Sequence, residues 1–174
     1  RTCTSGMLRT AAIVPITMGD TTVEAPGSPF HLTRTPANFG GTVPKVGEHN
    51  DHIAPRSGAR ADKRRTARPL EGLRIVDLSM GWAGPVCTRN LADLGADVIK
   101  IEACGYPDWW RGVDNRAETV TQRLYEKSSR FNIMNRGKRA ITLDLTVPDG
   151  VALAKALIKG ADAVIENYSA DVLR

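Results

Sequence analysis

The sequence predicts an α/β protein built on a doubly wound parallel sheet. Between residues 70 and 174, four short apolar runs typical of buried strands alternate with segments whose apolar residues recur at helical spacing. Such alternation favours parallel strands joined by helical crossovers. Of the 174 residues, 41% are hydrophobic, an ordinary value for a globular protein with one core. We expect an incomplete sheet and a mostly irregular N-terminal segment.

The first part of the pattern is strand, turn, helix and strand. Leu73–Ser79 is expected to form the first strand, followed by a glycine-containing turn at Met80–Pro85. The proline of this turn suits a first helical turn. The next residues place apolar side chains near one face of a helix, which Gly95 ends. Asp97–Glu102 is expected to form the second strand.

The second part repeats the pattern with a longer connection. A helix is expected around Thr119–Ser129, and Ala140–Leu145 supplies the third strand. Pro148 marks the start of another helix, which continues through residues 151–161. Asp162–Tyr168 is expected to form the fourth strand.

A basic segment separates these elements from the N-terminal part. Residues 53–69 hold six Arg or Lys against a single acid, Asp62, without hydrophobic periodicity. We expect a solvated linker that its charges keep extended. A nucleic-acid-binding arm is the alternative, but no aromatic residue lies between the cations to stack on bases. The expected organisation is a segment 1–52, a linker 53–69 and a domain 70–174, with no nucleic-acid partner.

Composition argues against several other classes of protein. The apolar run Ala11–Met18 is much shorter than the ~20 residues of a membrane-spanning helix and contains Pro15, so no membrane or secretory segment is expected. The three cysteines have neither metal-ligand spacing nor an even count, so no disulfide framework is expected and a reducing compartment is favoured. We expect the cytoplasm. His49 and His52 have no further ligands nearby in sequence, so no metal is expected. Because the chain begins with Arg1, we expect an excerpt of a longer protein.

Loops at the expected strand ends are the candidates for a ligand site, because doubly wound sheets bind ligands beyond the carboxyl ends of their strands. They are Met80–Pro85, Ala103–Asp108 and Asn167–Asp171. Gly81 and Gly84 in the first loop let backbone N–H groups approach an anion at a helix N-terminus, although they suit a plain packing turn equally well. The G-x-G-x-x-G and P-loop patterns are absent, so neither a dinucleotide nor a nucleoside triphosphate is expected.

Three stretches together resemble the family III CoA-transferases, also called the CaiB/BaiF family. They are LEGLRIVDLSMGWAGPVCTRNLADLGADVIKIE, NIMNRGKRAITLDL and GADAVIENYSADVL, in that order, and they span nearly all of residues 70–174. The resemblance implies a Rossmann-like domain that binds the nucleotide end of coenzyme A. It also implies an enzyme of two interlocked chains, with an acyl-CoA and a carboxylic acid acceptor as substrates and no metal.

The resemblance further implies which residues contact coenzyme A. They are Trp82, Ala83, Asn135, Arg136, Gly137, Lys138, Asn167 and Tyr168. Lys138 is expected nearest the phosphates, because charge-assisted hydrogen bonds suit such anions, and Gly137 allows close backbone approach. A solvated entry to the third strand is the alternative role for the cations at 136–139. Ala103 stands where some family members carry an Arg that reaches the nucleotide, so one phosphate contact is in doubt.

The N-terminal part resembles the end of the same family. GSPFHLTRTPANFGGTVPKVGEHNDHI is similar to the closing segment of family members. We interpret residues 1–52 as the C-terminal tail of a preceding CoA-transferase half and 70–174 as the beginning of a second half. The simplest account is a tandem fusion that replaces the interlocked homodimer, since a shared chain raises the effective concentration of its halves. Circular permutation is the alternative.

The bond-making chemistry is expected to lie outside these residues. In the family that the sequence resembles, an aspartate attacks the acyl-CoA thioester and an aspartyl-CoA thioester then forms, a case of covalent catalysis. That aspartate follows the fourth strand at a distance, so we expect no catalytic residue in this chain and no transferase activity from it alone. An acyl-CoA racemase of the same family, acting by proton abstraction, and a non-catalytic half that completes a partner's site are the alternatives.

Overall fold

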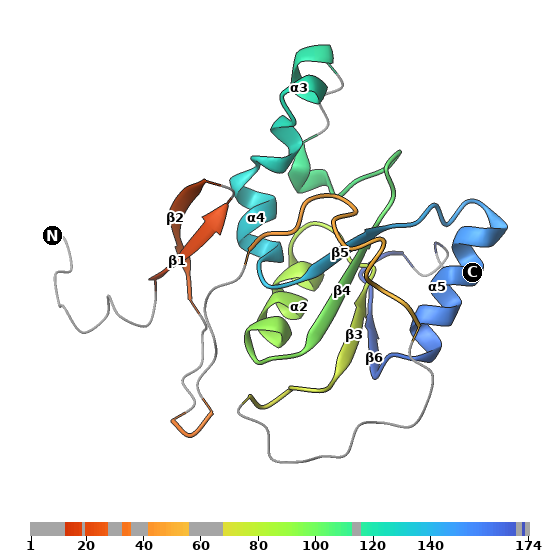
Figure 1. Cartoon of the computed structure of the whole chain (residues 1–174), viewed down its shortest axis with the longest axis horizontal. Coiled ribbons are helices and arrows are strands. Elements are labelled where there is room, and N and C mark those ends of the chain that lie inside the picture. The colour runs from red at the N-terminus through yellow and green to blue at the C-terminus, as the bar shows by residue number, and fades with distance from the viewer. Residues whose placement is uncertain are drawn as a thin grey trace, which may run out of the picture.

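A four-stranded parallel sheet forms the centre of the protein, and a two-stranded hairpin lies beside it (Figure 1). The computed structural model describes residues 13–18, 20–27, 33–35, 42–55, 68–112, 116–169 and 172. Most of the basic segment expected to be a linker, including Lys63, Arg64 and Arg65, lies outside the described residues.

The strands of the central sheet follow the predicted apolar runs. They are β3 (Arg74–Asp77), β4 (Asp97–Glu102), β5 (Arg139–Thr142) and β6 (Ala163–Ile165), in the order β5-β4-β3-β6. Val76 pairs with Ile99 on one side and Val164 on the other, and all strand pairs are parallel. The prediction of a parallel sheet is confirmed. The strands are shorter than several of the predicted runs because the ends of those runs leave the sheet as loops.

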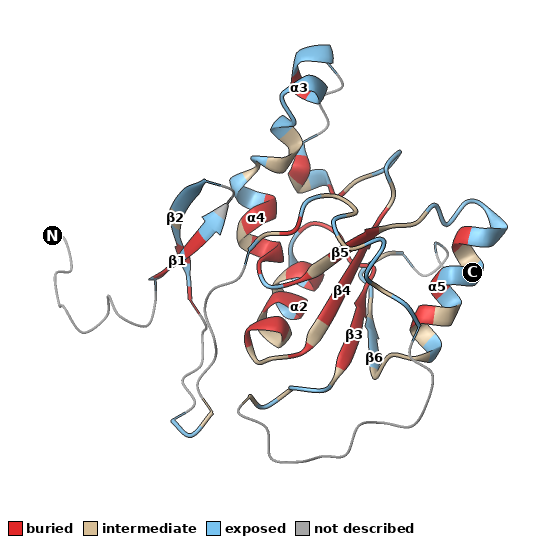
Figure 2. Cartoon of the chain, viewed as in Figure 1, coloured by how far each residue is buried: buried red, intermediate tan, exposed pale blue. Residues whose placement is uncertain are grey.

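Helices cover both faces of this sheet. On one face α5 (Pro148–Lys159) contributes Leu157 to a core cluster with Val76 and Ile99. On the other face α2 (Ala83–Asp93) packs against the alternate strand residues, such as Ile75, whose side chains point away from α5. Successive strand side chains point to opposite faces, so both faces of β3 and β4 are buried, as Figure 2 shows. The prediction of a doubly wound sheet is confirmed.

The winding reverses between β3 and β6. The connections from β3 to β4 and from β4 to β5 run on the α2 face, where α4 (Ser129–Asn135) packs against α2. The connection from β5 to β6 runs on the opposite face through α5. The carboxyl ends of β3 and β6 therefore flank the topological switch point, where open α/β sheets bind their ligands.

The expected helix at Thr119–Ser129 is wrong. The segment instead forms α3 (Ala117–Thr121), the short 3-10 helix η2 (Leu124–Glu126) and then α4. Arg123 interrupts the helix because it adopts the left-handed conformation, with φ of 51°. Ser128 then starts α4 as its N-cap by accepting a hydrogen bond from the Phe131 N–H at 3.4 Å.

The N-terminal part contains a hairpin that the sequence analysis did not predict. Strands β1 (Ile13–Met18) and β2 (Thr21–Pro26) pair antiparallel, with Met18 opposite Thr21. Val14 and Ile16 are buried while Ile13 is exposed, the alternation of a strand with one covered face. Gly19 and Asp20 between the strands are a residue pair typical of tight hairpin turns, which was the available signal.

Residues 46–53, named the docking segment below, cover the free edge of β5. The His49 N–H donates to the Ala140 oxygen at 2.9 Å, and the Ala140 N–H donates to His49 Nδ1 at 3.2 Å. Asn50 exchanges two hydrogen bonds with Thr142, at 2.8 and 2.9 Å. Ile53 packs against the core cluster under α5. A segment distant in sequence thus satisfies an edge that would otherwise present unpaired backbone groups.

Candidate functional site

The loop between β3 and α2 brings the start of a helix close to the switch point. A Cβ on Gly84 would lie 2.2 Å from the Cβ of Ser79, so only glycine allows this approach of helix to strand end. Trp82, directly before α2, makes no side-chain cap. The first N–H groups of a helix have no acceptor within it, and Ala83 is exposed. This turn can therefore present N–H donors to an anion.

Asn167 closes the loop from the β6 side. Its side-chain oxygen accepts from the Met80 N–H at 2.9 Å, and its amide donates to the Met80 oxygen at 2.8 Å. Tyr168 follows, half-buried against the α5-side core. Burial, together with the nearby carboxylates of Asp108 and Asp77, raises the pKa of its hydroxyl to about 12. The phenol therefore stays neutral at physiological pH and can donate a hydrogen bond.

A buried ion pair lies beneath this loop. Lys138 Nζ donates to Asp77 Oδ2 at 2.9 Å, to the Pro85 oxygen at 3.1 Å and to Asn135 Oδ1 at 2.7 Å, which uses all three of its donors. Burial raises the pKa of Asp77, but Lys138, Lys100 and two hydroxyl donors outweigh this effect and bring it to about 2. Burial lowers the pKa of Lys138, and although the attraction of Asp77 raises it in part, the result is about 8. Both groups are charged at neutral pH.

A second buried pair joins this loop to the loop after β4. Lys100 Nζ lies 3.2 Å from Asp108 Oδ2 and donates to the Ser79 oxygen at 2.7 Å. The Gly81 N–H lies 3.3 Å from the same carboxylate of Asp108. The 3-10 helix η1 (Trp109–Arg111) continues from here, and Arg111 pairs with Glu102 at 2.8 Å. Fixed charges on β4 therefore hold two of the strand-end loops against each other.

A pocket of about 440 Å³ lies beyond the carboxyl ends of β4 and β5. One wall is Ala103–Tyr106, after β4, and the other is formed by Thr142, Leu143, Asp144 and Thr146, at the end of β5. Tyr106 is 70% exposed, so its ring is open to a ligand. Sequence analysis named the first wall but missed the second. The available signal was its position directly after a predicted strand.

The family model of CoA-transferase family III matches residues 70–174. The chain belongs to this family. Curated relatives include the succinate–glutarate CoA-transferase of Agrobacterium fabrum, 39% identical over 105 residues, which make up 60% of this chain and 26% of that protein. The formyl-CoA:oxalate CoA-transferase of Afipia carboxidovorans is 41% identical over 107 residues, 62% of this chain and 24% of that protein.

Solved structures are also similar to part of this chain. A CaiB/BaiF family protein from Brucella suis is 36% identical, with a TM-score of 0.45, over 58% of this chain and 26% of that one. The chain spans about a quarter of the length of the curated relatives that it matches.

Four of the residues expected to contact coenzyme A come together at the switch point. Trp82 and Ala83 are exposed at the start of α2, and Asn167 is bound to the neighbouring Met80. Tyr168 follows directly in the chain. These residues come from two loops that are far apart in sequence. The loops lie close together because β3 and β6, the strands that they follow, are neighbours in the sheet.

The other four expected contacts occupy different places. Lys138 and Asn135 are buried under the loop and bond to each other, so the expectation of a lysine open to phosphate does not match its burial. Arg136 is fully buried and pairs with Asp93 at 2.9 Å, at the opposite end of α2 from Trp82. Gly137 is exposed but lies beside Ala92, also at that far end. Of the segment 135–138, expected to line the coenzyme A site, only Gly137 is therefore exposed.

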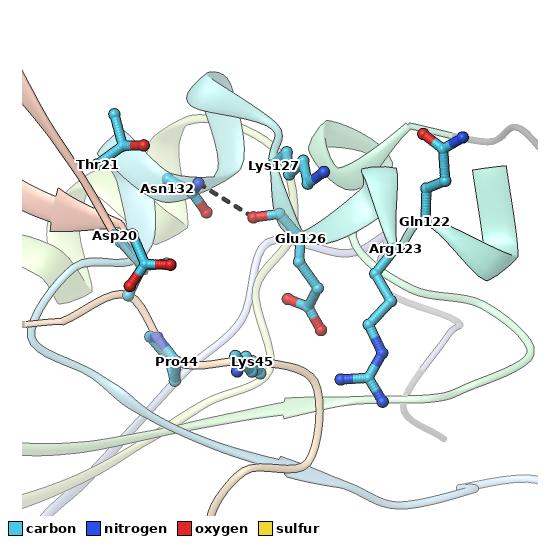
Figure 3. A pocket seen from close by; sticks show the side chains of 10 residues that line it. Asp20, Thr21, Pro44, Lys45, Gln122, Arg123, Glu126, Lys127 and Asn132 are labelled. Atoms are coloured by element: carbon cyan, nitrogen blue, oxygen red, sulfur yellow. Dashed lines mark hydrogen bonds between the residues drawn. The ribbon is translucent and has the colours of Figure 1, made fainter.

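A further pocket of about 500 Å³ lies between the β1–β2 hairpin and η2 (Figure 3). Two acids, Asp20 and Glu126, line it. Glu126 pairs with Arg111 at 2.9 Å and accepts from the Val46 N–H at 3.0 Å, so its carboxylate has protein partners. Asn132 donates to the Glu126 backbone oxygen at 3.2 Å. The pocket lies away from the strand ends, and we do not assign it to coenzyme A.

Among the described residues, no group of three or more His, Cys, Asp or Glu side chains could hold a metal ion. No helix in the same residues is long and apolar enough to cross a bilayer.

Proposed function

We propose that residues 70–174 are the coenzyme A-binding part of an acyl-CoA:carboxylate CoA-transferase. The observation that carries this proposal is the arrangement of the sheet's carboxyl edge. The pocket beyond β4 and β5 and the uncapped start of α2 at the switch point lie along the same edge. An extended anionic ligand is the kind of molecule that such an edge suits.

The nucleotide end of coenzyme A is proposed to occupy the β4–β5 pocket. Tyr106 offers an exposed ring on which a base can stack, a contact that any base can make. Ala103, whose position carries an Arg in some family members, lines the same pocket, which supports this placement. The remainder of the ligand would then extend past Tyr168 and Asn167 toward Trp82 and Ala83.

Lys138 and Asn135 are proposed to act by positioning rather than by contact. Their side chains are committed to Asp77, Pro85 and each other, so they fix the loop that the ligand would touch. Arg136 and Gly137 are not retained in the proposed site, because they lie at the far end of α2.

The transfer itself is proposed to use an aspartate outside this chain, through an aspartyl-CoA thioester. That the relatives described above are CoA-transferases by name supports group transfer over racemisation. The rest of the site would come from the preceding CoA-transferase half of a tandem fusion or from the partner of an interlocked homodimer.

Calorimetric titration of coenzyme A into the purified chain tests the proposal. Tyr106→Ala should weaken binding about 5- to 30-fold, because loss of one base–aromatic stack costs about 1–2 kcal/mol. Tyr125→Ala, in η2, is the matched control and should leave the dissociation constant unchanged. Equal binding by the Tyr106→Ala variant would move the nucleotide out of this pocket, and absence of any coenzyme A binding would contradict the proposed function.

A further inference from the structure

A pocket of about 660 Å³ opens between α2 and α4, with Trp82 in its wall. Helix α2 supplies Val86 and Arg89 after Trp82, at spacings of four and three residues that place them on one helix face. Helix α4 supplies Arg130, Ile133 and Met134. Trp110 of η1 and Pro26 of β2 complete the wall. Its volume lies within the range of about 300–1,000 Å³ that is usual for small-molecule sites.

Two buried N–H donors at this pocket have no acceptor within the described residues. They are Arg89 Nε and Trp110 Nε1. Arg89 is only 6% exposed, and its other nitrogens make long contacts, 3.5 Å to the Ile133 oxygen and 3.3 Å to Asn90 Oδ1. A buried donor without an acceptor costs roughly 1–3 kcal/mol, and more when charged, so such groups call for an explanation. A ligand that brings an acceptor into the pocket would remove this cost.

The same region carries more positive than negative charge. The Asp93 carboxylate acts electrostatically on Arg89 but accepts its hydrogen bond from the buried guanidinium of Arg136, at 2.9 Å. Arg130 lies with its guanidinium 4.9 Å from the centre of the Trp110 ring. Two arginines therefore border the pocket without a matching acid in it, which favours an anionic ligand.

The remaining walls are apolar. The rings of Trp82 and Trp110 pack edge to face with centroids 5.8 Å apart, and Val86 and Ile133 flank them. A ligand that fits these walls has a hydrocarbon body as well as an anionic group.

We infer that this pocket binds the acid partner of the transfer, and that it favours monocarboxylic acids with an aromatic or branched hydrocarbon body over small dicarboxylates such as oxalate. The carboxylate meets Arg89, Arg130 and the Trp110 N–H, while the body packs against the two indole rings. This inference rests on the proposed function, because Trp82 lies both in this pocket and at the proposed path of coenzyme A.

Titration of phenylacetate into the purified chain, followed by tryptophan fluorescence and calorimetry, tests the inference. Phenylacetate should bind at least 10-fold more tightly than 2-phenylethanol, which has the same body without the charge, and more tightly than oxalate. Arg130→Gln should weaken phenylacetate binding at least 10-fold, and so should Arg89→Gln. Lys155→Gln, an exposed cation on α5 at the opposite face, should leave it unchanged.

The variants separate the inference from a general loss of structure. Arg130 is exposed, so its replacement tests the pocket even if Arg89→Gln fails to fold. Phenylacetate binding that both arginine variants leave intact would overturn the inference. So would coenzyme A binding without any phenylacetate binding, an outcome that leaves the proposed function standing. A third outcome would also overturn the inference: phenylacetate does not bind, and Arg89→Gln changes the oligomeric state. That result would assign the pocket to a protein interface.

Discussion

At the scale of residues, the cations of Asn135–Arg139 neutralise the acids of the first strand–helix–strand unit. Each pairs with one carboxylate: Lys138 with Asp77 at the end of β3, Arg136 with Asp93 at the end of α2, and Arg139 with Asp97 at the start of β4. These partners are 61, 43 and 42 residues apart in sequence. Local sequence could therefore show that the stretch is cationic but not what it binds. A basic stretch before a buried strand can be internal charge compensation rather than an anion site.

Lys138→Met tests this compensation. The variant leaves the Asp77 carboxylate buried without its nearest cation, so the free energy of unfolding in urea should fall by about 3–5 kcal/mol. In the unsubstituted chain, the pKa of Asp77, about 2, lies below its ordinary value of 3.8. The resulting contribution, about 2 kcal/mol, is present above pH 4 and is lost as the pH falls through 2. In the variant the pKa of Asp77 should lie higher, because burial is opposed less, so this pH-dependent contribution should be smaller.

Two controls accompany this measurement. Lys155→Met removes an exposed lysine of α5 and should change the free energy of unfolding by less than about 0.5 kcal/mol. Asp77→Asn combined with Lys138→Met removes both charges and should be more stable than Lys138→Met alone. A Lys138→Met chain as stable as the unsubstituted one would mean that the pair contributes nothing.

At the scale of elements, periodicity predicted the strands and helices that bury a face, and it failed where other interactions decide. Buried strands and amphipathic helices leave a pattern in the sequence because the core selects apolar residues. The connection at 117–135 is instead set by a left-handed Arg123 and a cap at Ser128, whose hydroxyl also donates to the Trp110 oxygen. The candidate site was predicted as three loops at strand ends, and two of them do meet at the switch point. Which side chains are exposed there depends on packing, which periodicity does not encode.

The docking segment also escaped prediction, because its polar residues bond to a strand about 90 residues away. Asn50→Ala removes both bonds to Thr142 and should lower the free energy of unfolding by about 1–2 kcal/mol. The Thr142 amide, which donates to Asn50, should lose protection in hydrogen exchange. His52→Ala is the matched control, since the bonds of His52 to His49 and Arg139 are made by its backbone, which the substitution keeps. Equal exchange of Thr142 in both variants would rule out this role for Asn50.

At the scale of the whole molecule, the docking segment bears on how the two proposed halves are joined. In the proposed tandem fusion, residues 1–52 belong to the preceding half. Their last residues are nevertheless hydrogen-bonded to β5 of the domain that follows, and the Ala54 oxygen accepts from Arg74 at 3.1 Å. We expect the docking segment to be part of the folded unit of residues 70–174, so that the covalent connection through residues 56–67 maintains a high effective concentration rather than creating the contact.

Cutting the chain between residues 56 and 67, at an inserted site for a specific protease, tests this expectation. The two pieces should remain together in native mass spectrometry, because the hydrogen bonds of His49 and Asn50 and the packing of Ile53 do not depend on the connection. Because the interaction becomes intermolecular after cleavage, its stability should then depend on protein concentration.

Asn50→Ala combined with Ile53→Ser should release the N-terminal piece at concentrations where the unsubstituted pieces stay bound. If the unsubstituted pieces separate on cleavage and the remaining domain keeps its full free energy of unfolding, the N-terminal part is only tethered, and the edge of β5 is available to another segment of the longer protein.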